Sequence, residues 1–197
     1  MGHITSVGAG IYSDLSISQD ATNTPAACLA NPIAATWAAA FATAQAVSAS
    51  ASTAGMFKRI QNVREFPQMG VPPNIVNVPK YGSKASVQVQ GQADAPSFEV
   101  TLNYISDDWI TANLGAYVGS GNPYCFRFAL LNSEPTGWAS SAASIGTAKA
   151  GGTMGNSLYY WVGKMEALQI NPQLTDANQA TLTISIQSDF YGAFTGA

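Results

Sequence analysis

The residues that could do chemistry in this chain are few. His3 is the only histidine of 197 residues and lies close to the start of the sequence, where chains are often poorly ordered. We therefore expect neither a histidine-activated nucleophile nor a histidine-built zinc site within the fold. Cys28 and Cys125 lie in different kinds of segment and have no metal-ligand spacing, so we interpret both as free thiols of a reducing cytosol.

Two further patterns suggest chemistry but have simpler explanations. Asp107 and Asp108 are adjacent carboxylates that could do acid–base work. They also fit the first turn of a helix, where the helix dipole favours negative charge. The short glycine patterns at 8–10 and 119–121 lack the full G-x-G-x-x-G spacing and do not open a helix after a strand. The sequence therefore indicates no enzyme, no cofactor and no metal ion.

A run of aromatic residues raises the possibility of carbohydrate binding. Tyr159, Tyr160 and Trp161 are consecutive, and neighbours in a strand point to opposite faces, so at most two of them share a surface. Packing in a core or an interface is the favoured interpretation. A free-standing β-sandwich binding module, of carbohydrate or adhesin type, remains an alternative function, with Trp138 and Tyr124 as candidate exposed aromatics.

The composition favours a protein that associates. Charged residues make up 10% of the chain, against about 25% in ordinary soluble proteins. The net charge of -3 offers no basic surface for nucleic acid. Sheet edges are normally protected by charges, and low charge promotes association, so we predict a subunit of a larger assembly. A secreted or cell-surface β protein is the alternative. We expect no membrane span, because the longest apolar run is mostly alanine and is broken by Thr and Gln.

The stretch 97–119 is the centre of the predicted fold. Its first half alternates, which is typical of a half-buried strand. Phe98, Val100, Leu102 and Tyr104 lie on the apolar face, and Ser97, Glu99, Thr101 and Asn103 lie on the polar face. The period then changes to that of a helix over about 106–118, with Ser106 as the N-cap and Gly119 as the stop. The apolar stripe of this helix is Ile110, Leu114, Tyr117 and Val118.

The rest of the chain is rich in predicted strands. Alternating or strongly apolar runs predict strands over 10–18, 57–63, 74–78, 85–91, 124–131, 158–170 and 179–190. A second, Ala-rich helix is predicted over about 32–47, with Asn31 as N-cap, Pro32 at the first helical position, and one helical face formed by Ile33, Trp37, Phe41 and Ala44. A low-complexity loop is the alternative there. We predict a mainly β fold, a two-sheet β-sandwich or partial barrel in one domain over 1–197, with insertions at about 19–55 and 132–156.

The order of these parts resembles the major tail tube proteins of long, non-contractile-tailed bacteriophages. The resemblance covers about residues 57–191. It rests on five segments in order: FKRIQNVREFP, the long stretch from NIVNVPKYGSKASVQVQG to SFEVTLNY, SDDWITANLGAYV, YCFRFAL, and the closing pair from LYYWVGKMEALQI to QATLTISIQSDF.

The resemblance implies a structural virion protein. Members of this family form hexameric rings that stack into a hollow tube, through which the phage DNA passes without specific binding. The implied partners are other copies of the chain and the tape measure, tail tip and terminator proteins. The implied location is the virion tail, after assembly in the host cytoplasm. The inner tube of a contractile tail or of a secretion device shares the fold and is an alternative.

Two groups of residues are candidate sites in such a tube. By resemblance to the projecting loop of the family, the candidate contacts between rings are Lys80, Tyr81, Gly82, Ser83 and Lys84. The candidates for facing the lumen are Ser97, Glu99, Thr101 and Asn103, because they form the polar face of the central strand. An ordinary outer surface is an equal alternative for this second group.

Overall fold

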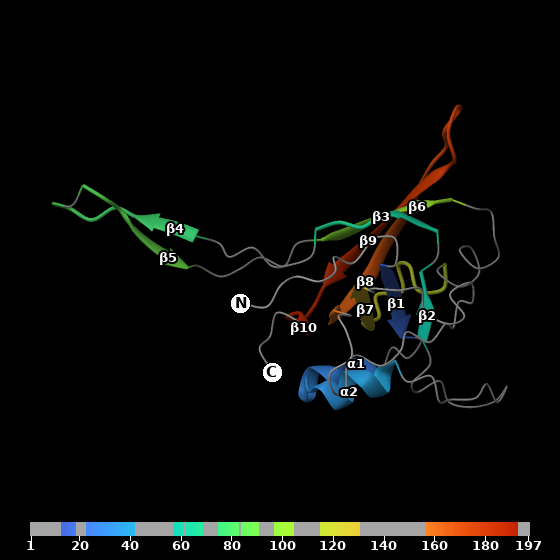
Figure 1. Ribbon diagram of the computed structural model, residues 1–197, viewed down its shortest axis with the longest axis horizontal. Coiled ribbons are helices and arrows are strands. Elements are labelled where there is room, and N and C mark those ends of the chain that lie inside the picture. The colour runs from blue at the N-terminus through green and yellow to red at the C-terminus, as the bar shows by residue number, and fades with distance from the viewer. Residues whose placement is uncertain are drawn as a thin grey trace, which may run out of the picture.

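The computed structural model is mainly β, as predicted. It describes residues 13–18, 23–41, 57–60, 62–68, 75–82, 84–90, 97–104, 115–130 and 157–192. Strands account for 51% of these residues, and the described residues contain two short helices. Figure 1 shows one large curled sheet, a helical layer against it and a separate small sheet.

Eight strands among the described residues form the large sheet, which curls into a half-barrel. The order is β2-β1-β7-β8-β9-β6-β3, with β10 paired to β8, and the pairings are antiparallel. The strands are β1 (Asp14–Ser18), β2 (Phe57–Arg59), β3 (Val63–Glu65), β6 (Phe98–Asn103), β7 (Tyr124–Leu130), β8 (Ser157–Asn171), β9 (Gln179–Ile186) and β10 (Tyr191–Gly192).

The connection from β2 to β3 explains why the sheet curls. The sequence predicts one strand over 57–63, but Asn62 adopts φ 60 and the run is split in two. β2 then pairs with β1 at one end of the sheet, and β3 pairs with β6 at the other. Only residues 60–62 separate the two strands, so at about 3.8 Å per Cα step the two ends of the sheet lie within about 15 Å of each other.

The main core lies inside the curl. The alternation predicted for β6 and β9 is confirmed, because their apolar residues are buried and the residues between them are exposed or half-buried. Phe126 of β7 stacks on Trp161 of β8 at a centroid distance of 5.5 Å. The largest fully buried side chains of this core are Trp161, Phe126, Leu15, Ile17, Leu102, Met165, Leu182, Ile184 and Val100.

Strand β8 joins the two halves of the sheet. It pairs with β7 as far as Gly163 and with β9 from Gly163 onward. A Cβ atom at Gly163 would lie 2.6 Å from the carbonyl oxygen of Ser185, so only glycine fits where the two halves meet. A bulge between Met165 and Ala167 follows at once. Bulges bend and twist strands, and this one comes where β8 leaves the first half of the sheet.

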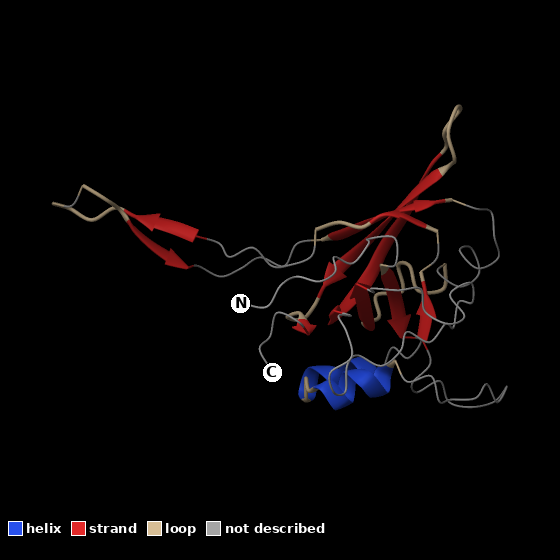
Figure 2. Ribbon diagram, in the orientation of Figure 1, coloured by secondary structure: helices blue, strands red, loops and turns tan. Residues whose placement is uncertain are grey.

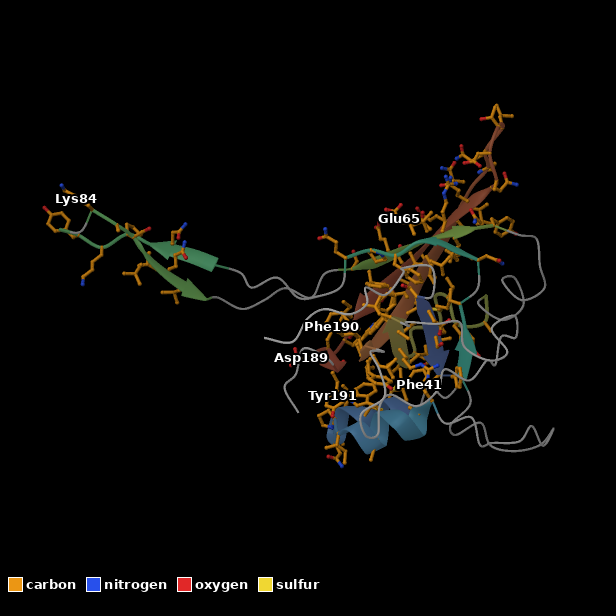
Figure 3. The ribbon with its side chains drawn as sticks, viewed as in Figure 1. Phe41, Glu65, Lys84, Asp189, Phe190 and Tyr191 are labelled. Carbon is orange, nitrogen blue, oxygen red and sulfur yellow. The ribbon has the colours of Figure 1, made fainter. Side chains whose placement is uncertain are left out.

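Two short helices cover part of the outer face. They are α1 (Asn23–Ala30) and α2 (Ala34–Ala40), and they lie below the sheet in Figure 1. A second buried cluster fills the space between them and β7 and β8, and Trp37 and Phe41 belong to it as the predicted helical stripe requires. Figure 3 shows Phe41 at this layer.

The predicted boundaries of the Ala-rich helix are wrong at its start. Asn31 and Pro32 precede the helix, and the backbone N–H groups of Thr36 and Trp37 donate to the carbonyl of Ile33. Ile33 is therefore at the helix start and is exposed, not part of the buried stripe. The described part of the predicted insertion at 19–55 also contains α1, which the sequence did not predict, and residues 42–47 lie outside the described residues.

The helix predicted over 106–118 is wrong in its last turn. Residues 115–119 form turns rather than a helix, and the backbone N–H of Ser120 donates to the carbonyl of Tyr117, a turn-type bond. Residues 105–114 lie outside the described residues, and so does 132–156. Gly119 has φ 67, as a stop requires, and Tyr117 and Val118 pack against the main core as predicted.

The second sheet is a hairpin of β4 (Ile75–Val78) and β5 (Val87–Gln90). It does not lie over the large sheet as the second layer of a sandwich. Figure 2 shows it standing well away from the half-barrel, at the left of the view. The partial-barrel form of the prediction is therefore the one that the structure has.

Candidate functional site

The projecting hairpin carries the candidate ring contacts at its tip. The strands β4 and β5 bring Lys80, Tyr81, Gly82 and Lys84 to the turn, and Ser83 lies outside the described residues. Gly82 has φ 81, a conformation that favours glycine, and Tyr81 is fully exposed. Lys84 marks the far end of the hairpin in Figure 3. The structure therefore brings these predicted residues together at the end of an arm.

The same arm has an apolar face that nothing covers among the described residues. Val78 pairs with Val87, and Val89 follows two residues on, so these three side chains point to one side of the hairpin. Their exposed fractions are 44%, 53% and 50%. Asn77 pairs with Gln88 on the opposite side, where Ile75 and Gln90 form the next pair toward the base of the arm. The arm is therefore amphipathic, and its apolar face is open; the sequence analysis singled out only its tip.

The candidate lumen residues form a continuous polar surface with the next strand. Glu99 pairs with Thr183, and Thr101 pairs with Thr181, so β6 and β9 present these side chains on one face. Asn103 pairs with Gln179 in the same register, and Ser97 is exposed just before the strand. The predicted division of this strand into an apolar and a polar face is confirmed.

Strand β8 extends this polar surface beyond Gly163. Ser185 donates a hydrogen bond of 2.6 Å to Glu166, and Gln187 donates one of 3.3 Å to Ser185. Lys164 pairs with Ser185 in the backbone register. The surface thus combines hydroxyl and amide groups with a small number of charges.

A second projection extends from the far end of β8 and β9 (Figure 1). Leu174 is fully exposed at its tip. Arg64 of β3 forms an ion pair with Asp176 at 3.0 Å, with both side chains about half exposed. The backbone N–H of Ala177 and then Arg64 lower the pKa of the Asp176 carboxyl. The predicted strands over 158–170 and 179–190 leave 171–178 as their connection, but nothing in the sequence indicates the contact with Arg64.

A buried polar network lies under the helices. Arg127 of β7 places its guanidinium carbon 4.6 Å from the ring centroid of Phe57 and 4.9 Å from that of Phe41. It donates to Ser16 at 3.5 Å, and Ser16 donates to Asp14 at 2.7 Å. This network fixes the cation between two aromatic rings and links the helical layer to β1 and β2. A buried arginine enclosed in this way is suited to structural stabilisation, and the sequence analysis missed it.

The aromatic residues considered for carbohydrate binding are in the core. Tyr124 is 4% exposed and packs edge-on against Tyr117 at 5.0 Å, so its candidacy as an exposed platform is wrong. Tyr159, Tyr160 and Trp161 are buried as well. The reason is that β7 and the first half of β8 are covered on both faces. Trp138 lies outside the described residues, as do His3, Asp107 and Asp108.

The described ranges contain no group of three or more His, Cys, Asp or Glu side chains that could hold a metal ion. The helices of the described part are too short to cross a membrane. Comparison of the sequence with protein-family models and with curated proteins gives no match.

Proposed function

We propose that this protein is the subunit of a phage tail tube. In this proposal, six copies form a ring, and rings stack into a hollow tube that conducts the genome into the host. The observation that carries it is the open valine face of the β4–β5 arm. The protein is then a structural component and not an enzyme, and it needs no cofactor.

The arm supports assembly because an isolated two-stranded hairpin is at best marginally stable in water. An amphipathic hairpin gains stability by placing its apolar face on another surface. Each valine gains roughly 1.5–3 kcal/mol when it goes from full exposure to full burial, and these three are about half exposed. A surface of a neighbouring copy would supply the missing cover. Lys80 and Lys84 at the tip suit contact with a chain whose net charge is -3.

The half-barrel is suited to ring formation. Its outer strands β2 and β3 span three residues each, so they cover only part of the edges of β1 and β6. In a ring, neighbouring copies would place their sheets side by side around a common axis, which leaves fewer exposed edges.

The polar face of β6 and β9 is the candidate wall of the bore. Ser97, Glu99, Thr101 and Asn103 would face water there. The β6 and β9 side chains of this wall are hydroxyl, amide and acidic groups, and cations beside them, such as Lys164 of β8, are few, so the wall would bind DNA phosphates weakly and the genome could move past it. The tape measure, tail tip and terminator proteins would then be partners, in a virion tail assembled in the host cytoplasm.

The test is negative-stain electron microscopy of the purified protein over a series of concentrations. We expect six-fold rings and stacked tubes with a central hole. The variant Val87→Thr/Val89→Thr keeps β-branched side chains but makes the face polar, so we expect single rings or short stacks. Gln88→Thr changes the opposite face of the same strand and should stack like the wild type.

Two results together would contradict the proposal. The first is that the protein stays monomeric at every concentration, and the second is that the valine variant sediments like the wild type. These results would rule out the tail tube proposal. A carbohydrate or adhesin module would then be the next candidate. Tubes that bind a co-expressed sheath protein would instead favour the inner tube of a contractile tail or secretion device.

A further inference from the structure

The fold brings the two cysteines of the chain together. Cys28 lies on the buried side of α1, whose neighbouring residues Ala27 and Leu29 are exposed. Cys125 lies on the outer face of β7, opposite Val162 in the register. Both thiols are 0% exposed and belong to the same buried cluster. In the sequence they are 97 positions apart (125 − 28), and nothing in their spacing indicates contact.

The two thiols are joined by a side-chain hydrogen bond. This bond lowers the pKa of the Cys28 thiol, and burial opposes it in the other direction. Cys28 and Cys125 therefore neighbour each other in the cluster between α1 and β7, and a disulfide forms where two such cysteines can bring their sulfur atoms to a bond length of about 2.05 Å. Both cysteines are free in the structure.

We propose that Cys28 and Cys125 are a site of oxidation, at which a small disulfide such as oxidised glutathione converts the two thiols into an intramolecular disulfide that fixes α1 to β7. The thiolate of one cysteine attacks a sulfur of oxidised glutathione, and the first glutathione leaves as its thiolate. The second cysteine thiolate then attacks the protein sulfur of this mixed disulfide and releases the second glutathione. Both protein thiols lose their protons and two electrons, and oxidised glutathione is reduced to two molecules of glutathione.

Helix α1 controls access to this site. It has eight residues and no charged side chain, and a helix of this length is not stable by itself. It is held by packing, and on the buried side the described residues are Pro25 and Cys28. An oxidant reaches the thiols when α1 lifts, and the disulfide then prevents it from lifting again. This inference does not depend on the tail tube proposal.

The experiment treats the full-length reduced protein with graded ratios of reduced to oxidised glutathione. The reaction is stopped with acid, free thiols are alkylated, and intact mass and peptide mapping identify the product. We expect both alkylation sites to disappear together, with a peptide that links Cys28 to Cys125. Because the bond closes a loop of 97 positions, it should raise Tm by roughly 10 °C. Added reductant should reverse this shift.

Two controls make the result decisive. In Cys28→Ala and Cys125→Ala no internal link can form, so oxidised glutathione should raise Tm of neither variant, and the remaining thiol should be found by intact mass either free or as the mixed disulfide with glutathione. A buried pair could resist oxidation because α1 opens slowly, so the reduced chain is also unfolded and refolded with the oxidant present. If the link is absent even after refolding, if the product is a disulfide between two copies, or if the linked protein melts at a lower temperature, the proposal is overturned.

Discussion

Among the described residues, the outer face of the large sheet is covered in one half and bare in the other, and β8 crosses from the covered half to the bare half. Before Gly163 its outward residues are Leu158, Tyr160 and Val162, which lie buried under the helical layer. After Gly163 the outward positions are polar or small and carry the surface shared with β9. Both halves have the same inner core. The difference is therefore set by what packs outside the sheet.

The two halves have different sequence patterns for this reason. The sequence of a strand that is buried on both faces is a continuous apolar run. In a strand with one solvent-exposed face, apolar and polar residues alternate. β7 is the first kind, since all its residues from Tyr124 to Ala129 are buried. β9 is the second kind, with burial at every other residue. The outer face of the covered half thus contributes buried apolar contacts to stability, whereas the outer face of the bare half can contact solvent or a partner.

The largest expected effect comes from placing a carboxylate in each half. Val162→Asp puts a charge under the helices, where the side chain is fully buried, and should cost about 4 kcal/mol or more or prevent folding. Thr183→Asp puts the same charge on the bare face and should change the unfolding free energy by less than about 1 kcal/mol. Denaturant unfolding measures both. Similar losses for the two variants would mean that the bare half is covered in solution.

The second prediction concerns Trp37, which packs the helical layer against the large sheet. Trp37 stacks on Tyr160 at 5.6 Å and lies 6.2 Å from Tyr191. Trp37→Ala should cost about 3–5 kcal/mol, the usual range for a buried tryptophan. Hydrogen exchange should show faster exchange in α1 and α2 while β6 and β9 keep their protection. A loss spread evenly over the whole sheet would contradict the separation of the two halves.

The bare half was the more predictable from the sequence. Alternation of apolar and polar residues in 98–103 and 179–186 predicted the strands, the buried face of each strand and the residues on it. A strand with one solvent-exposed face has a hydrophobic period of two. The continuous run of β7 predicted a strand, but such a run contains no information on what covers its outer side. The exposed valine face of the arm is also visible in the sequence as alternation in 87–90, although the distance of the arm from the body is not.

The covered half depends on contacts that sequence patterns do not record. α1 was missed because NTPAACLA has no charges, contains Pro25 and buries too few residues to show a helical period. The proximity of Cys28 to Cys125 and the burial of Arg127 between two rings follow from how α1 and α2 dock. The split at Asn62 was missed because one residue with positive φ interrupts a run that otherwise reads as one strand.

The third prediction tests whether an exposed surface acts in assembly. Lys80→Glu/Lys84→Glu reverses two charges at the tip of the arm, far from both clusters (Figure 3). The unfolding free energy should change by no more than about 0.5 kcal/mol, as for other exposed sites. If the tip contacts the next ring, the variant should form shorter tubes or unstacked rings at equal concentration. Wild-type tube length in the variant would show that the tip does not take part.

The smallest expected effect concerns the ion pair at the far end of the bare half. The backbone N–H of Ala177 and the guanidinium of Arg64 lower the pKa of Asp176 in the folded protein. A lowered folded pKa means that the unfolded chain takes up a proton first as the pH falls. The contribution of Asp176 is therefore present above the ordinary carboxyl pKa of about 4 and is lost as the pH falls through the folded value.

Asp176→Asn isolates this contribution. The variant should be slightly less stable than the wild type at neutral pH, and the difference should vanish as the pH falls below about 4. Because both side chains are about half exposed, added salt should reduce the difference. A difference that persists at low pH would mean that the amide disturbs the turn itself, and the ion pair would then have no part in holding the β8–β9 projection to β3.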